Sequence, residues 1–263
     1  MADVPALLQP VRSIGRWVLG AMGQAGAVTL FGVRGVAVAA SPPWFIGQLG
    51  RQILSVGYFS LPVVGLTAVF TGAALALNIY TGGGRFNAEQ IMPQIVALGI
   101  TRELGPVLAA LMLAGRVSAA MAAEIGAMRA TEQIDAMQTL STDPFRYLIA
   151  PRLFAAVLTL PVLTAVADII GIAGGWVVAT RTLNFNATVY VRNTWDFLEQ
   201  WDVVSGLLKA AVFGFIVALT GCYHGFNATG GARGVGRATT HAVVTGAVLI
   251  FATDYLMTSA FSR

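Results

Sequence analysis

The sequence predicts an all-α integral membrane protein with an interfacial amphipathic helix at its N-terminus and five transmembrane helices. Of the 263 residues, 56% are hydrophobic and only 11% are charged, whereas an ordinary soluble domain has about 25% charged residues. Five stretches are also apolar over roughly the 20 residues that a helix needs to cross a membrane. The net charge of +4 is too small to indicate a nucleic-acid-binding surface.

Residues 1–48 form the predicted interfacial segment. Arg12, Arg16 and Arg34 alternate there with Leu, Val, Trp and Gly, a mixture that suits a helix lying in the membrane surface with its arginines toward the headgroups. The segment has no compact apolar region ending in a small-residue cleavage site, so we expect no signal peptide.

Residues 49–263 form the predicted transmembrane domain, in which each span is an apolar run with few ionisable residues. The expected spans cover residues 52–84, 93–115, 153–180, 203–223 and 241–261. With the N-terminus in the cytoplasm, ten arginines lie on the cytoplasmic side and four outside. The positive-inside rule therefore predicts a cytoplasmic N-terminus and a periplasmic C-terminus.

The longest predicted cytoplasmic loop contains a helix at about residues 121–138. At 100° per residue, Glu124, Glu132 and Asp135 fall within about 80° of one another. Small and apolar side chains fall on another side: Ala123, Ala127, Ala130, Ile134 and Met137. Two interpretations stay open, a solvated connector helix and a helix that docks onto a cytoplasmic partner.

Arg102 and Glu103 interrupt the second span, where ionisable groups are costly and usually face a polar interior. They are either a structural ion pair at the outer end of the helix or a polar site for an anionic or amphipathic substrate, because an arginine can bind a phosphate with two parallel hydrogen bonds. Pro106, just after them, predicts a bend.

Three further ionisable residues lie within spans. Lys209 either extends its ammonium outward to the membrane surface or shares a cavity with Arg102, with Asp254 as its counter-ion. Asp168 lies nearer the middle of the membrane, where it is either a proton-relay residue or a packing partner at a helix contact.

No motif indicates catalysis or a bound cofactor. The glycine-rich GGARGVGR at residues 230–237 lacks the lysine of a nucleotide-binding P-loop. His224 and His241 flank one loop but have no third ligand for a metal. We therefore expect a non-enzymatic chain with no metal site and no cofactor of its own.

Several long blocks resemble the MlaE-type permeases of MCE-associated lipid ABC transporters. They are TRELGPVLAALMLAGR at 101–116, AAEIGAMRATEQIDAM at 122–137, the Asp143–Pro144 pair, FTGAALALN at 70–78 and GVGRATTHAVV at 234–244. The resemblance covers about residues 50–260. It implies a homodimer in the bacterial inner membrane that moves phospholipids to or from a periplasmic MCE-domain protein.

The resemblance also implies the other partners. A separate cytoplasmic ABC ATPase would bind ATP and magnesium, and a small STAS-domain protein often accompanies it. The block at 122–137 is similar to the coupling helix of the family, which assigns Glu124, Arg129, Glu132 and the neighbouring Asp135 to ATPase docking. Phospholipid-site positions carry over onto Arg102, Glu103 and Lys209, while Gly83 and Phe86 occupy positions near the lipid cavity. We add Asp254 to the expected substrate site as the counter-ion of the lysine.

Two other classes of function are weighed against this interpretation. An ion-coupled secondary transporter could use Asp168, Asp254 and Lys209 as a relay, but it would not explain the acidic loop helix, and no inverted repeat is visible. An intramembrane lipid-modifying enzyme would need a nucleophile or a metal site near Glu103, and the sequence has neither.

Overall fold

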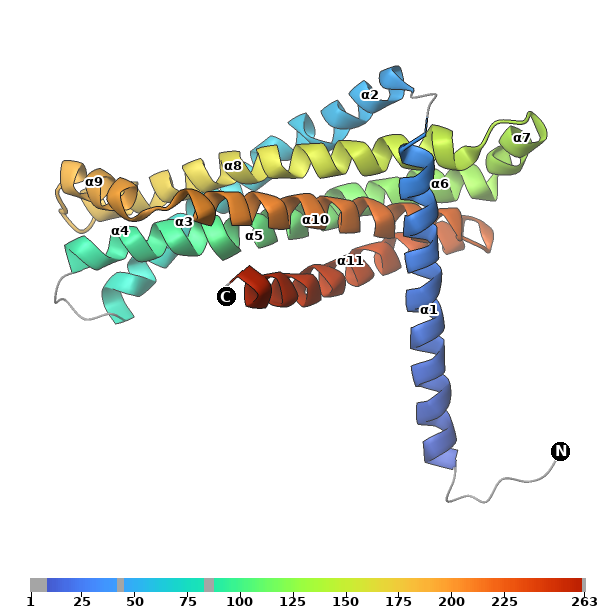
Figure 1. Ribbon diagram of the computed structural model, residues 1–263, viewed down its shortest axis with the longest axis horizontal. Coiled ribbons are helices and arrows are strands. Elements are labelled where there is room, and N and C mark those ends of the chain that lie inside the picture. Colours follow the sequence, from blue (N-terminus) through green and yellow to red (C-terminus); the bar gives the residue numbers. More distant parts are fainter. Residues whose placement is uncertain (1–8, 42–44, 83–87, 262–263) are drawn as a thin grey trace.

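The computed structural model describes residues 9–41, 45–82 and 88–261, and these residues form helices without any strand (Figure 1). The helices are α1 Gln9–Ala39, α2 Ile46–Val56, α3 Leu61–Gly82, α4 Ala88–Gly99, α5 Gly105–Leu113, α6 Ala119–Ala130, α7 Gln133–Thr139, α8 Ala150–Arg181, α9 Ala187–Phe197, α10 Gln200–Phe226 and α11 Gly231–Phe261. A 3₁₀ turn at Tyr58–Ser60 leads into α3, and π-helical turns occupy Ile100–Leu104, Ala114–Ser118 and Phe145–Ile149.

These elements join into long helical stretches that match the five predicted spans and extend beyond them. By length and composition, the candidate spans are Met22–Ala39, Ile46–Gly82, Glu89–Ala130, Phe145–Arg181, Gln200–Phe226 and Gly231–Phe261. The last five contain the predicted apolar runs, apart from 83 and 84, which lie outside the described residues. Helical hydrogen bonding continues past at least one end of each apolar run, so the helices are longer than hydropathy alone indicates.

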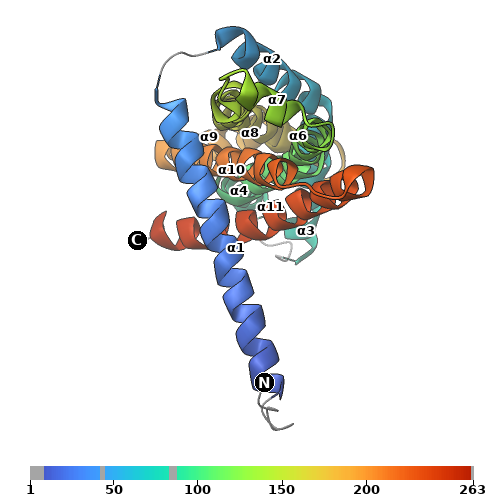
Figure 2. The ribbon, with the colours of Figure 1, turned by 90° about the vertical axis from the view of Figure 1, so that its right-hand side faces the viewer.

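The remaining candidate span belongs to α1, which the sequence analysis placed in the membrane surface. Figures 1 and 2 show α1 running crosswise to the long helices of the bundle, and its N-terminal half projects beyond them. The C-terminal half of α1 packs on the bundle through Phe31. The centroid of its ring lies 4.9 Å from that of Phe145 and 5.5 Å from that of Tyr223. A crosswise direction is the one an interfacial helix would take. The interfacial placement stays a prediction.

Helix α8 is the centre of the bundle and packs against α3 on one side and α10 on another. The contact between α3 and α8 is a close approach of two backbones. A Cβ atom added at Gly72 would collide with the carbonyl oxygen of Gly171, so only glycine allows this distance. In a membrane, such small residues let helices gain close van der Waals contact where no hydrophobic effect drives them together.

The single helix expected at 121–138 is wrong. Helix α6 ends at Ala130, and Glu132 adopts a left-handed conformation with a φ of 58° before α7 begins. The buried face of α6 is also not the predicted alanine side but the face of Met121, Ala122, Ile125 and Gly126. Of the predicted apolar side, Ile134 alone is fully buried, and it anchors α7 to the core.

Candidate functional site

A π-helical turn and a proline together expose a backbone carbonyl inside the bundle. In an α-helix the carbonyl of Arg102 would accept a hydrogen bond from the N–H of residue 106. Residue 106 is proline, which has no N–H, and the turn at Ile100–Leu104 pairs Gly105 with Ile100 instead. The Arg102 carbonyl is therefore available to a side chain from another helix, and π-turns of this kind often occur at functional sites.

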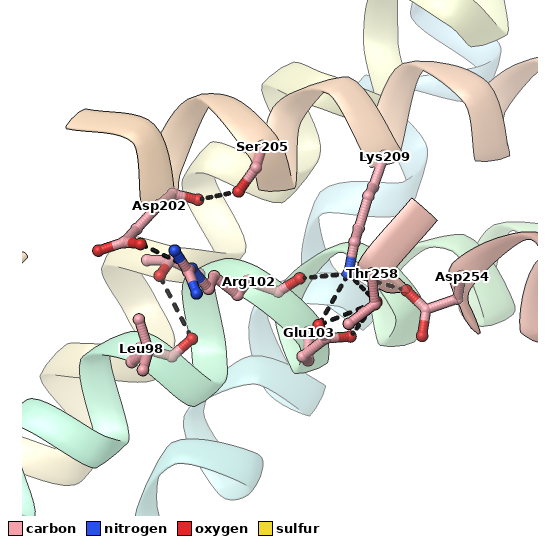
Figure 3. A network of polar contacts seen from close by, with 9 residues as sticks. Leu98, Arg102, Glu103, Asp202, Ser205, Lys209, Asp254 and Thr258 are labelled. Carbon is pink, nitrogen blue, oxygen red and sulfur yellow. Dashed lines mark hydrogen bonds and ion pairs between the residues drawn. The ribbon is translucent and has the colours of Figure 1, made fainter. Parts of the chain in front are cut away.

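Lys209 of α10 supplies that donor. Its Nζ donates to the Arg102 carbonyl at 2.9 Å, to Glu103 Oε1 at 2.9 Å and to Thr258 Oγ1 at 2.7 Å (Figure 3). Asp254 Oδ1 lies 3.1 Å from the same nitrogen as an ion pair. The Lys209 side chain is only 2% exposed, and the hydrogen bonds above use all three N–H groups of an ammonium.

Arg102 points the other way along α10. Its Nε donates to Asp202 Oδ1 at 2.6 Å, and Asp202 is almost fully buried. The other carboxylate oxygen of Asp202 accepts the backbone N–H of Glu199 in a capping box that starts α10. Asp202 therefore holds one edge of the guanidinium, and the described residues offer its two terminal amino groups no hydrogen bond.

We call Arg102, Glu103, Asp202, Lys209, Asp254 and Thr258 the polar cluster. Its carboxylates outnumber its cations by one. Most of it is closed off by α10 and α11, but the side chains of Arg102 and Glu103 are each 39% exposed. The cluster thus offers one cation and one carboxylate side by side on an otherwise apolar helix surface.

The structure brings four of the predicted substrate-site residues together, namely Arg102, Glu103, Lys209 and Asp254. Of the two interpretations of Arg102 and Glu103, a structural ion pair between them is wrong, because Arg102 pairs with Asp202 and Glu103 pairs with Lys209. Extension of Lys209 to the membrane surface is also wrong, whereas Asp254 is its counter-ion as expected. The remaining two predicted positions, Gly83 and Phe86, lie outside the described residues.

Asp168 is not part of the polar cluster. It is buried on α8 against the backbone of Gly105, where an added Cβ would collide with its carboxylate. Neither carboxylate oxygen has a hydrogen-bond partner among the residues that the structure describes. Asp168 of α8 thus contacts Gly105 at the end of the π-turn, whereas Lys209 contacts the turn from α10.

Asp202 and Thr258 belong to the cluster and were not predicted. Asp202 precedes Lys209 by two helical turns and so lies on the same face of α10. Thr258 follows Asp254 by one turn on α11 and donates to Glu103 Oε1 at 3.1 Å. Helical spacing from the predicted residues was the available signal for both.

The predicted coupling residues do not share one acidic face. Glu124 reaches Arg152 of α8, with 2.9 Å between Oε2 and Nη2, and Arg129 pairs with Asp135 across the break between α6 and α7. Glu132 lies at the break itself and is exposed. The segment is therefore a corner that carries two ion pairs, with one carboxylate at its tip.

Comparison with known proteins identifies the family. The family model described as "Permease MlaE" matches residues 49–260, which include the π-turns, the polar cluster and the corner. The chain belongs to the MlaE permease family. It is 49% identical over 257 residues to a probable ABC transporter permease protein of Rickettsia felis, covering 98% of this chain and 99% of that one.

More distant relatives in the MlaE permease family carry more specific names. The chain is 34% identical over 216 residues to the intermembrane phospholipid transport system permease protein MlaE of Haemophilus influenzae, which covers 80% of this chain and 81% of that one. It is 36% identical over 211 residues to the chloroplastic protein TRIGALACTOSYLDIACYLGLYCEROL 1 of Arabidopsis thaliana, covering 80% and 60% of the two chains. Membership of the MlaE permease family makes this chain a multi-pass membrane protein and a transport subunit rather than a catalytic enzyme.

Proposed function

We propose that this permease moves phospholipids between the bacterial inner membrane and a periplasmic MCE-domain protein, powered by a separate cytoplasmic ATPase. The observation that carries the proposal is the polar cluster, which leaves Arg102 and Glu103 open on an apolar surface. The name of the Haemophilus relative supports the class of substrate. ATP and magnesium would bind to the ATPase, and a STAS-domain protein is a further expected partner.

The open pair suits a zwitterionic headgroup. The terminal amino groups of Arg102 can donate two parallel hydrogen bonds to a phosphate, and the Glu103 carboxylate can accept an ammonium. Lys209 has no donor left for the lipid in this conformation. We therefore assign Lys209 and Asp254 a positioning role, in which they hold Glu103 and the π-turn in place.

A homodimer would complete the site. Charged side chains at membrane depth rarely face lipid tails and usually face a partner or a polar cavity. Arg102 and Glu103 are each 39% exposed in the single chain, so a second copy opposite them would enclose the headgroup in a shared cavity. The N-terminus would be cytoplasmic and the C-terminus periplasmic.

One helical stretch connects the proposed lipid site to the proposed ATPase site. Residues Glu89–Ala130 form a single candidate span that carries Arg102 and Glu103 about a third of the way along it and leads into the corner at Glu132 just beyond its C-terminal end. Motion of an ATPase bound at the corner would reach the cluster along this stretch. Glu132 would contact the ATPase. Glu124, which pairs with Arg152, and the Arg129–Asp135 pair would support the corner.

Affinity purification from native membranes in mild detergent tests the assembly. We expect an ATPase and an MCE-domain protein among the co-purifying proteins. Glu132→Lys should release the ATPase and leave the chain folded. The control is Asp196→Lys, a charge reversal on exposed α9, which should leave the ATPase bound. Co-purification unaffected by Glu132→Lys would contradict the docking role.

Lipid occupancy tests the substrate site and the competing function. Arg102→Gln should reduce the phospholipid recovered with the purified complex, with Arg192→Gln on exposed α9 as the matched control. Equal recovery would contradict the headgroup role. Ion-gradient-driven transport by this chain alone in liposomes would favour the ion-coupled secondary transporter instead.

A further inference from the structure

A large cleft separates α1 from α10 and α11 at the end of the bundle away from the polar cluster. Its volume is about 1160 Å³, at or above the upper end of the roughly 300–1,000 Å³ typical of small-molecule sites. His224, at one end of the cleft, follows Lys209 on α10 by a spacing that corresponds to about 22 Å at 1.5 Å per residue. The cleft is therefore distinct from the proposed substrate site.

The lining of the cleft changes from polar to apolar along α10 and α11. Near the C-terminal end of α10 the lining side chains are polar: His224, Asn227, His241 and Thr245. Further along both helices, toward the middle of the spans, they are apolar: Phe215, Leu219, Val248 and Leu249. Helix α1 closes the third side with the small and apolar residues Ala25, Val28, Gly32, Val33, Val36 and Ala37 and with the polar residues Gln24 and Thr29. An amphiphile has the same change of polarity along its length.

The polar end is organised by contacts among its own side chains. The imidazole rings of His224 and His241 stack with centroids 5.9 Å apart, and His224 Nε2 lies 3.2 Å from Thr245 Oγ1. Imidazole, hydroxyl and amide groups can all donate hydrogen bonds to phosphate oxygens. None of the described residues that line the cleft is acidic, so no lining carboxylate would repel a phosphate.

The apolar end of the cleft lies where α1 crosses the bundle. A Cβ atom added at Gly32 of α1 would lie 3.3 Å from the side chain of Leu219 and 3.6 Å from that of Phe215, so α1 covers the apolar lining that extends along α10 and α11. We propose that this cleft binds a membrane phospholipid, with the phosphate at His224 and Thr245 and an acyl chain between α1, α10 and α11. This inference does not rest on the proposed transport function, because it needs only the cleft and a surrounding membrane.

Phospholipid retention by the full chain tests the site. The chain is reconstituted in nanodiscs of phosphatidylcholine and phosphatidylethanolamine, re-extracted in a delipidating detergent, and its bound phospholipid is counted by native mass spectrometry. Val248→Trp should fill the cleft and lose this phospholipid. Val244→Trp is the matched control, since both valines are exposed on α11 (62% and 56%) but only Val248 lines the cleft.

A second arm tests the polar end without filling the cleft. His224→Leu should lose the phospholipid, and His224→Gln, which keeps a donor, should retain more of it. Retention equal to wild type in both Val248→Trp and His224→Leu would overturn the proposal. Displacement by soluble glycerol phosphate would also overturn it, because the site would then recognise a free phosphate compound.

Two further outcomes separate this site from its alternatives. If Val248→Trp converts a dimer to a monomer in light scattering while lipid retention is unchanged, a second copy covers the cleft and the proposal is wrong. Arg102→Gln should leave this phospholipid in place even if it removes one from the proposed substrate site. A further fall in the phospholipid count when Val248→Trp is added to Arg102→Gln supports the cleft site whether or not the proposed transport function holds, and no further fall would contradict it.

Discussion

Replacement of Lys209 by methionine is the most direct test of the polar cluster. Methionine has nearly the length of lysine but no ammonium, so the apolar packing stays while the charge is lost. Glu103 and Asp254 would then lack their cation. The Arg102 carbonyl would have no donor at all, because Pro106 cannot supply one.

The expected loss of stability follows from the burial of each group. Removing one partner of a buried ion pair costs about 3–5 kcal/mol. Glu103 is 39% exposed, so water can solvate part of its uncompensated charge, and the lower figure of about 3 kcal/mol applies. For a chain of this size that corresponds to a fall in melting temperature of about 6–12 °C.

Thermal unfolding of the purified chain in detergent, followed by tryptophan fluorescence, measures this loss. Adding Glu103→Gln to Lys209→Met should recover part of it, because one uncompensated carboxylate disappears. Arg192→Met is the control, since the ion pair of Arg192 with Asp196 is exposed and should contribute less than about 1 kcal/mol. The stabilising role of the Lys209 ammonium would be refuted if Lys209→Met had the melting temperature of wild type. It would also be refuted if the double variant had a melting temperature no higher than that of Lys209→Met.

Four other predictions concern features around the cluster and the corner. Asp202→Ala removes the Arg102 ion pair and the capping box, so it should cost more than the roughly 1–2 kcal/mol of a lost cap and speed hydrogen exchange in the first turn of α10; unchanged exchange would argue against the cap. Gly206→Val should abolish the folded state, because even a Cβ there collides with the Thr101 carbonyl, whereas Gly236→Ala, in open space, should express normally. Glu132→Gly should raise stability by about 1 kcal/mol by relieving the left-handed conformation, and a lower melting temperature would contradict this. Burial raises the pKa of Tyr190 from 10.0 to about 12, so the stability that the neutral phenol contributes should be lost between these pH values, and a phenolate titration should show one late tyrosine that is missing in Tyr190→Phe.

The spans were predictable because an apolar run of sufficient length has few alternatives to a membrane helix. Their ends were not, because α-helical and π-helical hydrogen bonding carries the second span from the predicted 93–115 to Glu89–Ala130. Helix α9 was not predicted, since Ala187–Phe197 is short and partly polar. Its signal was local: the Asn186 side chain accepts the backbone N–H groups of Thr188 and Val189 and starts the helix.

The composition of the site was more predictable than its pairing. Membrane depth alone indicated Arg102, Glu103, Lys209 and Asp254, because ionisable residues are rare there. The pairing of carboxylates with cations depends on how α10 and α11 pack against the π-turn. The spacing of residues along one helix cannot predict how separate helices pack. The corner was mispredicted because Glu132 has a positive φ, which is uncommon for a residue other than glycine.

The π-turns have a consequence for how this chain tolerates changes in length. A π-turn holds one residue more than the α-helical turn it replaces. Deleting Gly115 from the turn at Ala114–Ser118 would restore an ordinary α-helix and keep the helical faces on either side in register. Deleting Leu111 from α5 would instead rotate everything beyond it by about 100°. Natural insertions and deletions in this helix should therefore be concentrated at its π-turns.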